Sequence, residues 1–562
     1  MDMGKFREEI SIFLKKQGIS RIDLEIPPDP EMGDYAFPCF ALSRENREKP
    51  NETAKRLADK FRPGKLISKA IVAGPYLNFY VNKQKLAEEV LKDIIRQKEN
   101  YGSRKKKKER IMVEYSSPNV NKAQHLGHVR NNLLGMALSN ILEFSGYDVV
   151  RTCVMNDKGM GVAKMMLAYK LWAKGMKPDI KSDHFASRWY VEFGKKAEKD
   201  PSLEDKAQEI NRLFESGDEV TIKLWKKMTK WVYKGYDETY KRLGCVFDRI
   251  YYESELYKHG KDIVLKGLKK GIFEKDDGAV IVNLEKLKLP NKILIKSDNT
   301  TLYMTQDIYL AELKFSDFRI DRSIYVVASE QNMHFQQLFA ILDMLGYKWA
   351  EKCFHLSYGM ISLPEGKMKS RQGTVVDADD LMDDMENLAY EEVDKRHELS
   401  DKEKSMRAVQ IGIGALKFFI LKYEPAKDFL YDTKESISFE GETGPYVQYA
   451  HARIRSIFRK YGKPINTGID YSLLSHELEK RLLVLLKQFP EIIEESARSY
   501  KPSIPCNYLI RLSQGFNEFY HTCPILKAEP ELMMARLVLA DCIRQVLDNG
   551  LRLLGIEAPE EM

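Results

Sequence analysis

Apolar runs alternate with a helical pattern in the second hundred residues of the chain. Residues 111–115 form a short, strand-like apolar run, and residues 147–155 form a second one that is rich in β-branched side chains. Between them, apolar residues recur at helical spacing over residues 124–144. A strand, a helix and a strand in this order are typical of a parallel sheet, and apolar runs at 322–328 and 353–361 could supply further strands. We therefore predict a Rossmann-like parallel α/β fold.

The segments around this pattern differ from it in character. Residues 1–103 combine helical patterns with one short strand, which predicts a small α+β domain, and residues 104–110 form a basic linker. Residues 158–300 are mostly charged amphipathic helix, and we interpret them as an insertion into the parallel-sheet domain, which would span residues 111–400. Residues 401–562 carry helical patterns to the end of the sequence and predict an all-α bundle.

The same periodicities locate individual elements in these segments. The chain shows no internal repeat. Helices are expected at residues 5–16, 53–61, 83–98, 405–423, 446–460, 473–499, 508–520 and 531–554, and short strands at residues 76–81, 279–283 and 292–295.

Composition places the chain among ordinary globular proteins. Its 562 residues are 43% hydrophobic and 31% charged, which is enough for several domains with separate cores. No run of about 18 uncharged apolar residues occurs, and the N-terminus lacks the pattern of a secretory signal, so we expect no membrane span and no export. The seven cysteines form no CxxC pair, which disfavours a zinc knuckle or a disulfide framework and favours a reducing, cytoplasmic setting.

The net charge of +7 is concentrated near the N-terminus. Residues 1–110 contain 25 Lys and Arg against 17 Asp and Glu, a local net charge of +8. A basic N-terminal domain is a weak indication of a polyanionic partner such as nucleic acid. A solvated, lysine-rich surface would produce the same composition, so the charge alone does not decide between the two.

A pair of histidines opens the predicted helix that follows the first strand. His125 and His128 are three residues apart and therefore share one face of the helix, and Gly127 lies between them. The N-terminus of a helix offers free N–H groups to an anion, and a glycine lets a base or a ribose approach the backbone. This arrangement suits the phosphates of a nucleotide, although two surface histidines around a glycine would look the same in sequence.

A second, basic motif follows the last predicted strand. Residues 366–373 read Gly-Lys-Met-Lys-Ser-Arg-Gln-Gly, so that Lys367, Lys369 and Arg371 fall within five residues between two glycines. Three cations on a flexible loop could clamp a polyphosphate and stabilise charge during attack on its α-phosphate. The chain has no P-loop sequence, so ATP would have to bind in another way. Taken alone, the motif also fits an exposed basic loop.

Together, in this order, the two motifs resemble the HIGH and KMSKS signatures of class I aminoacyl-tRNA synthetases. Further blocks are similar to the arginyl-specific members of that family, and the resemblance covers nearly the whole chain. It implies an ATP-dependent ligase that joins L-arginine to the 3′ end of its transfer RNA through an arginyl-adenylate, releases AMP and pyrophosphate, and acts as a monomer. The similar blocks lie at residues 33–37, 74–79, 114–122, 303–307, 327–334, 444–453 and 553–562.

The resemblance also assigns the arginine-binding residues. It implies that arginine is contacted by Glu114, Asn119, Tyr303, Asp307 and Gln331. A guanidinium presents five donors in a planar fork and favours carboxylates, so Asp307 would pair with it, while Glu114 would hold the α-ammonium or an edge of the site. The structural alternatives are a strand-end surface charge for Glu114, a core position for Tyr303 and a helix cap for Asp307.

For the nucleotide and the RNA, the resemblance implies three further sets of residues. Catalysis would depend on Lys122, His125, His128, Lys367, Lys369 and Arg371. ATP, with Mg²⁺ on its phosphates and no metal ligands from the protein, would contact His125, Gly127, His128, Lys367 and Met368. The tRNA elbow would touch the N-terminal domain, and the anticodon region would touch Tyr446, Tyr449 and Met562. For the two tyrosines, a core stripe on one helix is an equal alternative.

The basic loop departs from the family pattern, which reads close to Lys-Met-Ser-Ser/Thr-Arg-Lys-Gly. Lys369 is an extra cation and Gln372 lacks the usual charge. This family often lacks one lysine of the signature, and the resemblance implies that Lys122, just before the histidines, supplies that charge. The role of any single cation within the loop therefore stays open.

Three other functions fit parts of the sequence. Another class I synthetase would bind a different amino acid, but the cysteines lack zinc-site spacing and the insertion is too short for a large editing domain. A catalytically silent paralogue would not need His125, His128 and Lys122 together. A nucleotidyltransferase on the same fold would not need residues 401–562.

Overall fold

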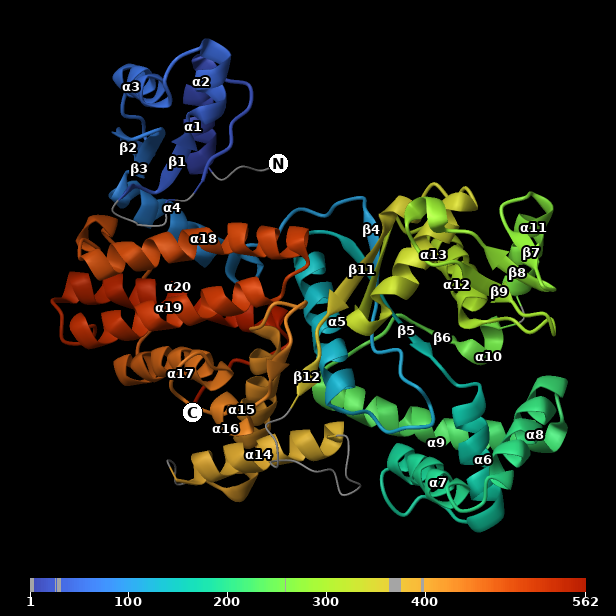
Figure 1. Ribbon diagram of the computed structural model, residues 1–562. Helices are drawn as coiled ribbons and strands as arrows, with labels where there is room; N and C mark the ends of the chain where they lie inside the picture. The colour runs from blue at the N-terminus through green and yellow to red at the C-terminus, as the bar shows by residue number, and fades with distance from the viewer. Residues whose placement is uncertain (1–4, 26, 28–31, 258, 363–375, 396–398) are drawn as a thin grey trace. The chain divides into compact units, whose positions relative to one another are not determined.

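The computed structural model of the protein divides the chain into two compact units (Figure 1). It describes residues 5–25, 27, 32–257, 259–362, 376–395 and 399–562. The first unit consists of Met1–Tyr101, Ile454–Phe489 and Leu512–Val546, and the second of Gly102–Arg453, Pro490–Arg511 and Leu547–Met562. The domain limits expected from the sequence stay predictions.

Within the described chain, a five-stranded parallel sheet forms the centre of the second unit. The order of its strands is β11-β10-β4-β5-β6. This confirms the predicted parallel α/β fold, and every strand except β6 coincides with an apolar run in the sequence. The strands are β4 (Arg110–Glu114), β5 (Asp148–Met155), β6 (Arg249–Tyr252), β10 (Arg322–Ala328) and β11 (Cys353–Tyr358).

The strand β6 lies inside the range that the sequence indicated as an insertion. It has four residues, pairs with β5 at the edge of the sheet, and buries only the side chain of Tyr251 completely. A strand this short, with exposed Arg249 at its start, leaves no apolar run in the sequence. Sequence patterns therefore did not predict β6 or draw attention to Glu253, which directly follows it.

The helix α5 (Leu126–Phe144) connects β4 to β5 and packs on β4, β5 and β10. Ile111, Met112 and Val113 of β4 are inaccessible to solvent, as expected for a parallel strand covered on both faces. The chain runs outward from β4 through β5 to β6 and then returns to β10 on the other side of β4. In open α/β sheets, ligands bind where the strand order reverses, outside the carboxyl ends of the strands. The topology thus locates a candidate site beyond the ends of β4 and β10.

Helices and a small antiparallel sheet separate the other strands (Figure 1). Between β5 and β6 lie α6 (Met160–Trp172), α7 (Ser182–Ala197), α8 (Ser202–Ser216) and α9 (Glu219–Leu243). Between β6 and β10 lie α10 (Glu253–Leu256), α11 (Gly260–Lys269), the strands β7 (Glu274–Asp276), β8 (Ala279–Val282) and β9 (Lys292–Ile295), and α12 (Tyr303–Phe318). The helix α13 (Asn332–Met344) joins β10 to β11.

The chain beyond β11 is mainly helical, which confirms the predicted helical C-terminal region. The two short strands in it pair with each other in parallel. In chain order the elements are β12 (Ile361–Ser362), α14 (Ala378–Asp394), α15 (Asp401–Leu421), β13 (Phe429–Leu430), α16 (Thr433–Ser436), α17 (Gly444–Tyr461), α18 (Glu477–Ser499), α19 (Ser503–Thr522) and α20 (Pro530–Leu553).

The N-terminal part of the first unit folds around a three-stranded antiparallel sheet in the order β1-β3-β2. Its helices α1, α3 and α4 and its strand β3 lie close to the ranges expected from the sequence, whereas α2, β1 and β2 were not predicted. The elements are α1 (Lys5–Lys16), β1 (Tyr35–Pro38), α2 (Phe40–Asn46), α3 (Pro50–Lys60), β2 (Ile67–Ala73), β3 (Tyr76–Val81) and α4 (Lys83–Gln97).

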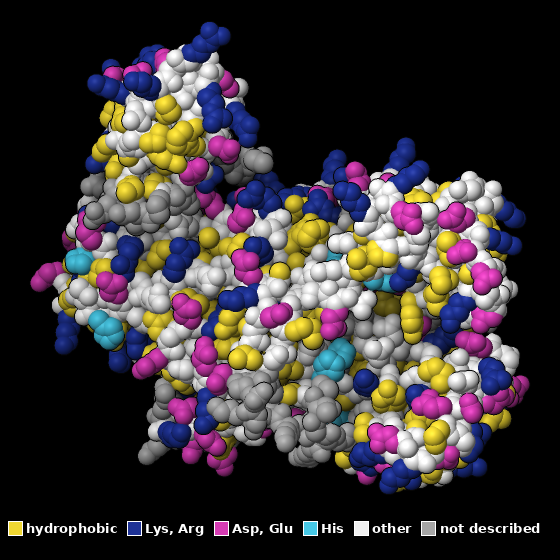
Figure 2. Space-filling model, viewed as in Figure 1, with side chains coloured by type: hydrophobic (Ala, Val, Ile, Leu, Met, Phe, Trp, Pro, Cys, Tyr) yellow, Lys and Arg dark blue, Asp and Glu magenta, His cyan; other side chains and the backbone are white. Residues whose placement is uncertain are grey.

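The surface mixes positive and negative side chains. Figure 2 shows Lys and Arg beside Asp and Glu over most of the visible face, and Lys and Arg stand out on the N-terminal helices. The cysteines are free, and all except half-buried Cys353 are buried. No helix among the described residues is long and apolar enough to cross a bilayer.

A close approach between α5 and Tyr115 can be tested by substitution. A Cβ atom added to Gly135 would overlap Cβ and Cγ of the buried Tyr115 side chain. We expect Gly135→Ala to lower the free energy of unfolding by about 1–3 kcal/mol, because a packed core does not accept an extra methyl group without strain. The matched control is Gly194→Ala in α7, where open space surrounds the Cβ position and helix propensity should add up to about 1 kcal/mol. Thermal unfolding measures both, and equal midpoints would contradict the prediction.

Candidate functional site

A turn after β4 brings Asn119 back to the carboxyl end of the sheet. Ser116 and Ser117 adopt positive φ angles of 75° and 45°, which are rare for residues with a side chain. The Ser116 N–H donates to the Asn131 side chain of α5, and Asn119 forms a bridge with Asn156, just beyond β5. Residues in sparsely populated backbone conformations cluster at functional sites, so this turn is a candidate for one.

A polar pocket of about 330 Å³ lies at this end of the sheet. Its volume falls in the range of small-molecule sites. Four of the five residues expected to contact arginine line it, and Glu114 is the exception. The polar lining includes Asn119, Glu253, Tyr303, Asp307, Gln331 and His334.

The first turns of α12 supply Tyr303 and Asp307, which lie four residues apart and so share one face of the helix. Tyr303 is 69% exposed, which excludes a core position. Leu302 is the N-cap of α12 and Asp307 lies a turn further in, which excludes a capping role. Instead, an Asp307 carboxylate oxygen hydrogen-bonds to Nε2 of His334 at 2.7 Å.

Glu253 is a pocket residue that the sequence did not indicate. It is the first residue of α10, directly after β6, and it is buried. Burial raises its pKa to about 7; the charges of Asp157 and Asp307 act in the same direction, and the charge of Lys158 opposes them. A buried carboxyl group beside a second one is suited to pair with a cation, which would restore its ionised form. An acid at the carboxyl end of a parallel strand was the available signal, but β6 itself was not predicted.

Glu114 ends β4 but is not among the residues that line the pocket. It is buried, so it is not a surface charge, and it forms an ion pair with Lys314 of α12. The Lys314 side chain is inaccessible to solvent, and its Nζ lies 4.3 Å from the centre of the Tyr325 ring. The carboxylate of Glu114 thus contacts a cation of the protein itself. Its expected role in arginine binding is not supported by this geometry and stays a prediction.

The two histidines of the first motif cap α5. The His125 Nδ1 accepts a hydrogen bond from the Gly127 N–H at 3.1 Å, and the His128 Nδ1 accepts one from the His125 N–H at 3.2 Å. These two bonds close a capping box. Because both Nδ1 atoms accept, each neutral ring carries its proton on Nε2 and can donate it. A Cβ atom at Gly127 would lie 3.0 Å from the His125 ring, so this cap leaves little room for a side chain there.

Both histidines are held in the neutral form. Burial lowers the pKa of His125, and the charge of Lys122 acts in the same direction. Burial, together with His125 and Lys122, lowers the pKa of His128 to about 3. At neutral pH the motif therefore offers two uncharged N–H donors. The positive charge beside them comes from Lys122, which is exposed and lies 5.7 Å from the centre of the Tyr190 ring.

The second motif falls in residues 363–375, which lie outside the described residues. The predictions for Lys367, Met368, Lys369 and Arg371 concern this segment. The chain just before it is held by Arg130 of α5, a buried guanidinium bonded to backbone carbonyl groups. Arg130 donates to the carbonyl oxygens of Gly359, Met360, Pro425 and Lys427, at 2.5, 3.0, 2.9 and 2.8 Å respectively.

The chain just after the second motif is bonded to the first. The Leu126 N–H donates to the Val376 carbonyl at 2.9 Å, and the Ala378 N–H donates to the Gln124 carbonyl at 3.0 Å. Between these bonds, His125 and Asp377 face each other in an antiparallel bridge. The described chain on each side of the second motif is therefore bonded to α5 or to Gln124 and His125, which directly precede α5.

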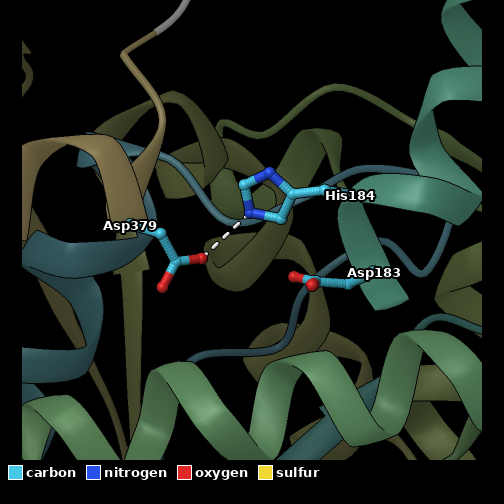
Figure 3. A group of neighbouring side chains, drawn as sticks. All are labelled: Asp183, His184 and Asp379. Carbon is cyan, nitrogen blue, oxygen red and sulfur yellow. Dashed lines mark hydrogen bonds and ion pairs between the residues drawn. The ribbon is translucent and has the colours of Figure 1, made fainter. Parts of the chain in front are cut away.

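One group of described side chains has the composition of a metal site (Figure 3). Oxygen or nitrogen atoms of Asp183, His184 and Asp379 all lie within 4.8 Å of one another. The Lys181 Nζ, however, lies 2.7 Å from Asp379 Oδ2 and 3.1 Å from Asp183 Oδ2. An ammonium group already occupies the place of a cation, so the donor set does not fit a metal ion.

The tyrosines expected to touch RNA lie on α17. Tyr446 and Tyr449 are three residues apart and half-buried, so neither is a fully buried core residue. His451 of the same helix hydrogen-bonds to the Pro559 carbonyl at 3.0 Å. The C-terminal tail, which ends at Met562, is thereby attached to the helix that carries both tyrosines.

Comparison with known protein families matches three successive parts of the chain. The family described as tRNA synthetases class I (R), catalytic domain, matches residues 90–433. The Arginyl tRNA synthetase N terminal domain matches residues 4–81. The DALR anticodon binding domain matches residues 447–562.

Relatives named arginine–tRNA ligase align with almost the whole chain. That of Treponema denticola is 44% identical over 560 residues, which cover 96% of this chain and 95% of the relative. That of Porphyromonas gingivalis is 42% identical and covers 94% of each chain. Among solved structures, the Thermus thermophilus arginyl-tRNA synthetase has a TM-score of 0.86 and 28% identity over 99% of both chains. The Plasmodium falciparum arginyl-tRNA synthetase has a TM-score of 0.81 at 20% identity, a likeness of fold.

Proposed function

The chain belongs to the arginyl-tRNA synthetase family, and from this premise we propose that two pocket carboxylates, those of Glu253 and Asp307, recognise its amino acid. The chain is an ATP-dependent class I ligase that charges tRNA with arginine. The observation that carries the proposal is the lining of the pocket, where both acids lie with Tyr303, whose ring is exposed.

A guanidinium matches this lining better than any other natural side chain. Its planar fork of five N–H donors can reach both carboxylates at once, and the Tyr303 ring offers a face for the flat cation. A lysine ammonium is a compact charge with three donors, and it would leave part of the buried acceptor set unpaired. Unpaired buried acceptors are costly, so the pocket discriminates against lysine.

The remaining pocket residues suit the other end of the amino acid. Asn119 and Gln331 carry amide groups that can donate to a carboxylate and accept from an ammonium. We infer that they hold the α-amino and α-carboxylate groups, since the acids serve the guanidinium. Asn119 lies in the same segment between β4 and α5 as Lys122 and His125. The α-carboxylate would therefore point toward the proposed ATP site.

The start of α5 is the proposed ATP site. The Nε2–H donors of His125 and His128 and the ammonium of Lys122 can bind phosphate oxygens, and Gly127 provides close approach to the backbone. Mg²⁺ would arrive on the phosphate oxygens of ATP, which is its usual way of binding in nucleotide enzymes. For the loop residues we propose contacts with the nucleotide and with the leaving pyrophosphate; these residues are Lys367, Met368, Lys369 and Arg371.

The reaction then proceeds in two steps. An oxygen of the arginine carboxylate attacks the α-phosphorus; a new O–P bond forms as the bond to the bridging oxygen of the β-phosphate breaks, and pyrophosphate leaves. A hydroxyl of the terminal tRNA adenosine next attacks the carbonyl carbon and loses its proton, and AMP leaves with the electrons of the broken C–O bond. The protein contributes position and charge, and we assign no side chain as a general base.

Two parts of the chain are proposed to hold tRNA. Tyr446 and Tyr449 on α17, with the tail that ends at Met562, would contact the anticodon loop, because unstacked bases bind aromatic side chains. The basic N-terminal domain would contact the elbow. One chain carries all of these parts, so we propose that a monomer is the active form.

Replacement of Asp307 tests the arginine pocket. We expect Asp307→Asn to raise KM for arginine by about a hundredfold, about 3 kcal/mol, because the guanidinium loses a charged acceptor. The KM for ATP should change by less than about threefold, since Asp307 serves only the amino acid. Asp343→Asn, on the exposed side of α13, is the control and should leave both constants unchanged. Steady-state charging of tRNA gives these values. Equal losses for arginine and ATP would assign Asp307 a structural role, and charging with another amino acid instead of arginine would contradict the function.

The raised pKa of Glu253 predicts a pH dependence of arginine binding. Below its pKa of about 7, Glu253 is protonated in the free protein and must lose its proton to pair with the guanidinium. KM for arginine should therefore rise as pH falls from about 8 to 6, by at most tenfold per pH unit for one proton. Glu253→Gln should bind arginine more weakly at high pH and should lack this slope. A wild-type KM that does not change over the same range would contradict the prediction.

A further inference from the structure

A half-buried ammonium, that of Lys181, joins the helices between β5 and β6 to the chain that follows the second motif. Lys181, the N-cap of α7, donates from Nζ to Asp379 Oδ2 and to the Thr239 hydroxyl, both at 2.7 Å. The His184 Nε2 lies 3.0 Å from the same oxygen of Asp379 and 3.6 Å from Asp377 Oδ1. Figure 3 shows His184 and Asp379 pointing toward each other from α7 and α14.

The cluster packs against α9. Asp183 is inaccessible to solvent and lies so close to α9 that a Cβ atom at Gly235 would overlap its carboxylate. On the other side, Arg242 of α9 pairs with Asp379 Oδ1 at 3.4 Å. Burial alone would raise the pKa of Asp379, but the hydrogen bond from His184 and the charge of Lys181 lower it to about 2. The Asp379 carboxylate is therefore ionised throughout the working range of pH.

Two acids of this cluster, Asp377 and Asp379, lie at the start of α14, and the start of α14 is bonded to the first motif. Asp377 is the N-cap of α14 and faces His125 in the antiparallel bridge. Ala378, between Asp377 and Asp379, donates to the carbonyl oxygen of Gln124. A side chain of α7 that holds Asp379 thus also holds the segment that adjoins the histidines.

We propose that Lys181 and His184 are positioning residues of the nucleotide site, which fix residues 376–379 against Gln124–Leu126. They do not touch the reacting atoms. They determine where residues 376–379 lie relative to His125, and so how the two histidines present their Nε2–H donors to a nucleotide. The proposal rests on the proposed function, in that it takes the first motif to bind ATP.

Two substitutions test this role. We expect Lys181→Met to raise KM for ATP or lower kcat by roughly tenfold or more, because a small misplacement of binding groups has large kinetic effects. KM for arginine should stay within about twofold, since Lys181 and His184 are not in the arginine pocket. Lys181→Arg keeps the cation and should recover part of the loss. Arg188→Ala, which removes an exposed ion pair with Asp179 near the start of α7, is the matched control and should have no effect.

His184 adds a pH-dependent readout. Burial alone would lower its pKa, but the hydrogen bond with Asp379 and the charges of Asp377 and Asp183 raise it, with Lys181 and Arg242 as the neighbouring cations. Protonated His184 pairs with both acids of α14, so KM for ATP should rise as pH increases above the ordinary histidine value of 6.5. His184→Gln keeps a hydrogen-bonding side chain without the charge and should lack that rise.

The outcomes distinguish positioning of the ATP site from no role and from a general structural role. Unchanged ATP kinetics in both variants would overturn the proposal. An equal loss for arginine and ATP in a folded variant, judged by thermal unfolding, would also overturn it, because it would show a general brace. Direct titration with ATP gives the same answer independently of charging. A wild-type chain that fails to charge arginine would therefore refute the proposed function while ATP affinity still decides the role of Lys181 and His184.

Discussion

The cap of α5 is the constraint on which the rest of the site depends. His125 and His128 use Nδ1 to satisfy backbone N–H groups at the start of the helix, and this fixes both rings and leaves each Nε2 as a donor. The proposed nucleotide site thereby uses the same side chains as the helix cap. Burial keeps the rings neutral, so they serve as hydrogen-bond donors of defined direction rather than as charges. The positive charge that phosphates require must come from lysine and arginine side chains around them.

Helix α5 also fixes the flanks of the basic motif. Arg130, two residues beyond His128, binds the chain before residues 363–375 through carbonyl oxygens, while the bridge between His125 and Asp377 joins the chain after them to the start of α5. The two terminal nitrogens of the buried Arg130 guanidinium donate to four carbonyl oxygens, so the contact is made to backbone and not to a carboxylate. The two motifs are therefore brought together by backbone contacts that their own sequences do not reveal.

The sequence predicted the parts of this structure that depend on local pattern. Buried parallel strands such as β4 leave continuous apolar runs, and the long helices have clear periodicity, so both were found. Four of the five residues expected to contact arginine were identified by resemblance to a family, and the pocket brings these four together. What was missed depends on tertiary contacts. The short edge strand β6 has no pattern, and with it Glu253 went unnoticed. Lys181 and Asp379 are nearly two hundred residues apart in the sequence, so no local pattern connects them. The sequence also did not show that Glu114 forms an ion pair with Lys314.

A pocket with two acids poses an electrostatic problem when no cation is bound, because a buried carboxylate such as that of Glu253 then has no partner. The structure meets this problem differently at each acid. Asp307 hydrogen-bonds to His334, Glu114 pairs with Lys314, and Glu253 has its pKa raised to about 7, so that a proton can neutralise it. Of these three acids, Glu253 and Asp307 line the pocket and Glu114 does not. Only Glu114 among the three forms an ion pair with a fully buried lysine. In the proposed site, arginine would displace a proton from Glu253 and a histidine contact from Asp307. A strong internal ion pair, such as that of Glu114, would not give way to arginine so easily. This difference is a physical reason to assign guanidinium recognition to Glu253 and Asp307 rather than to Glu114.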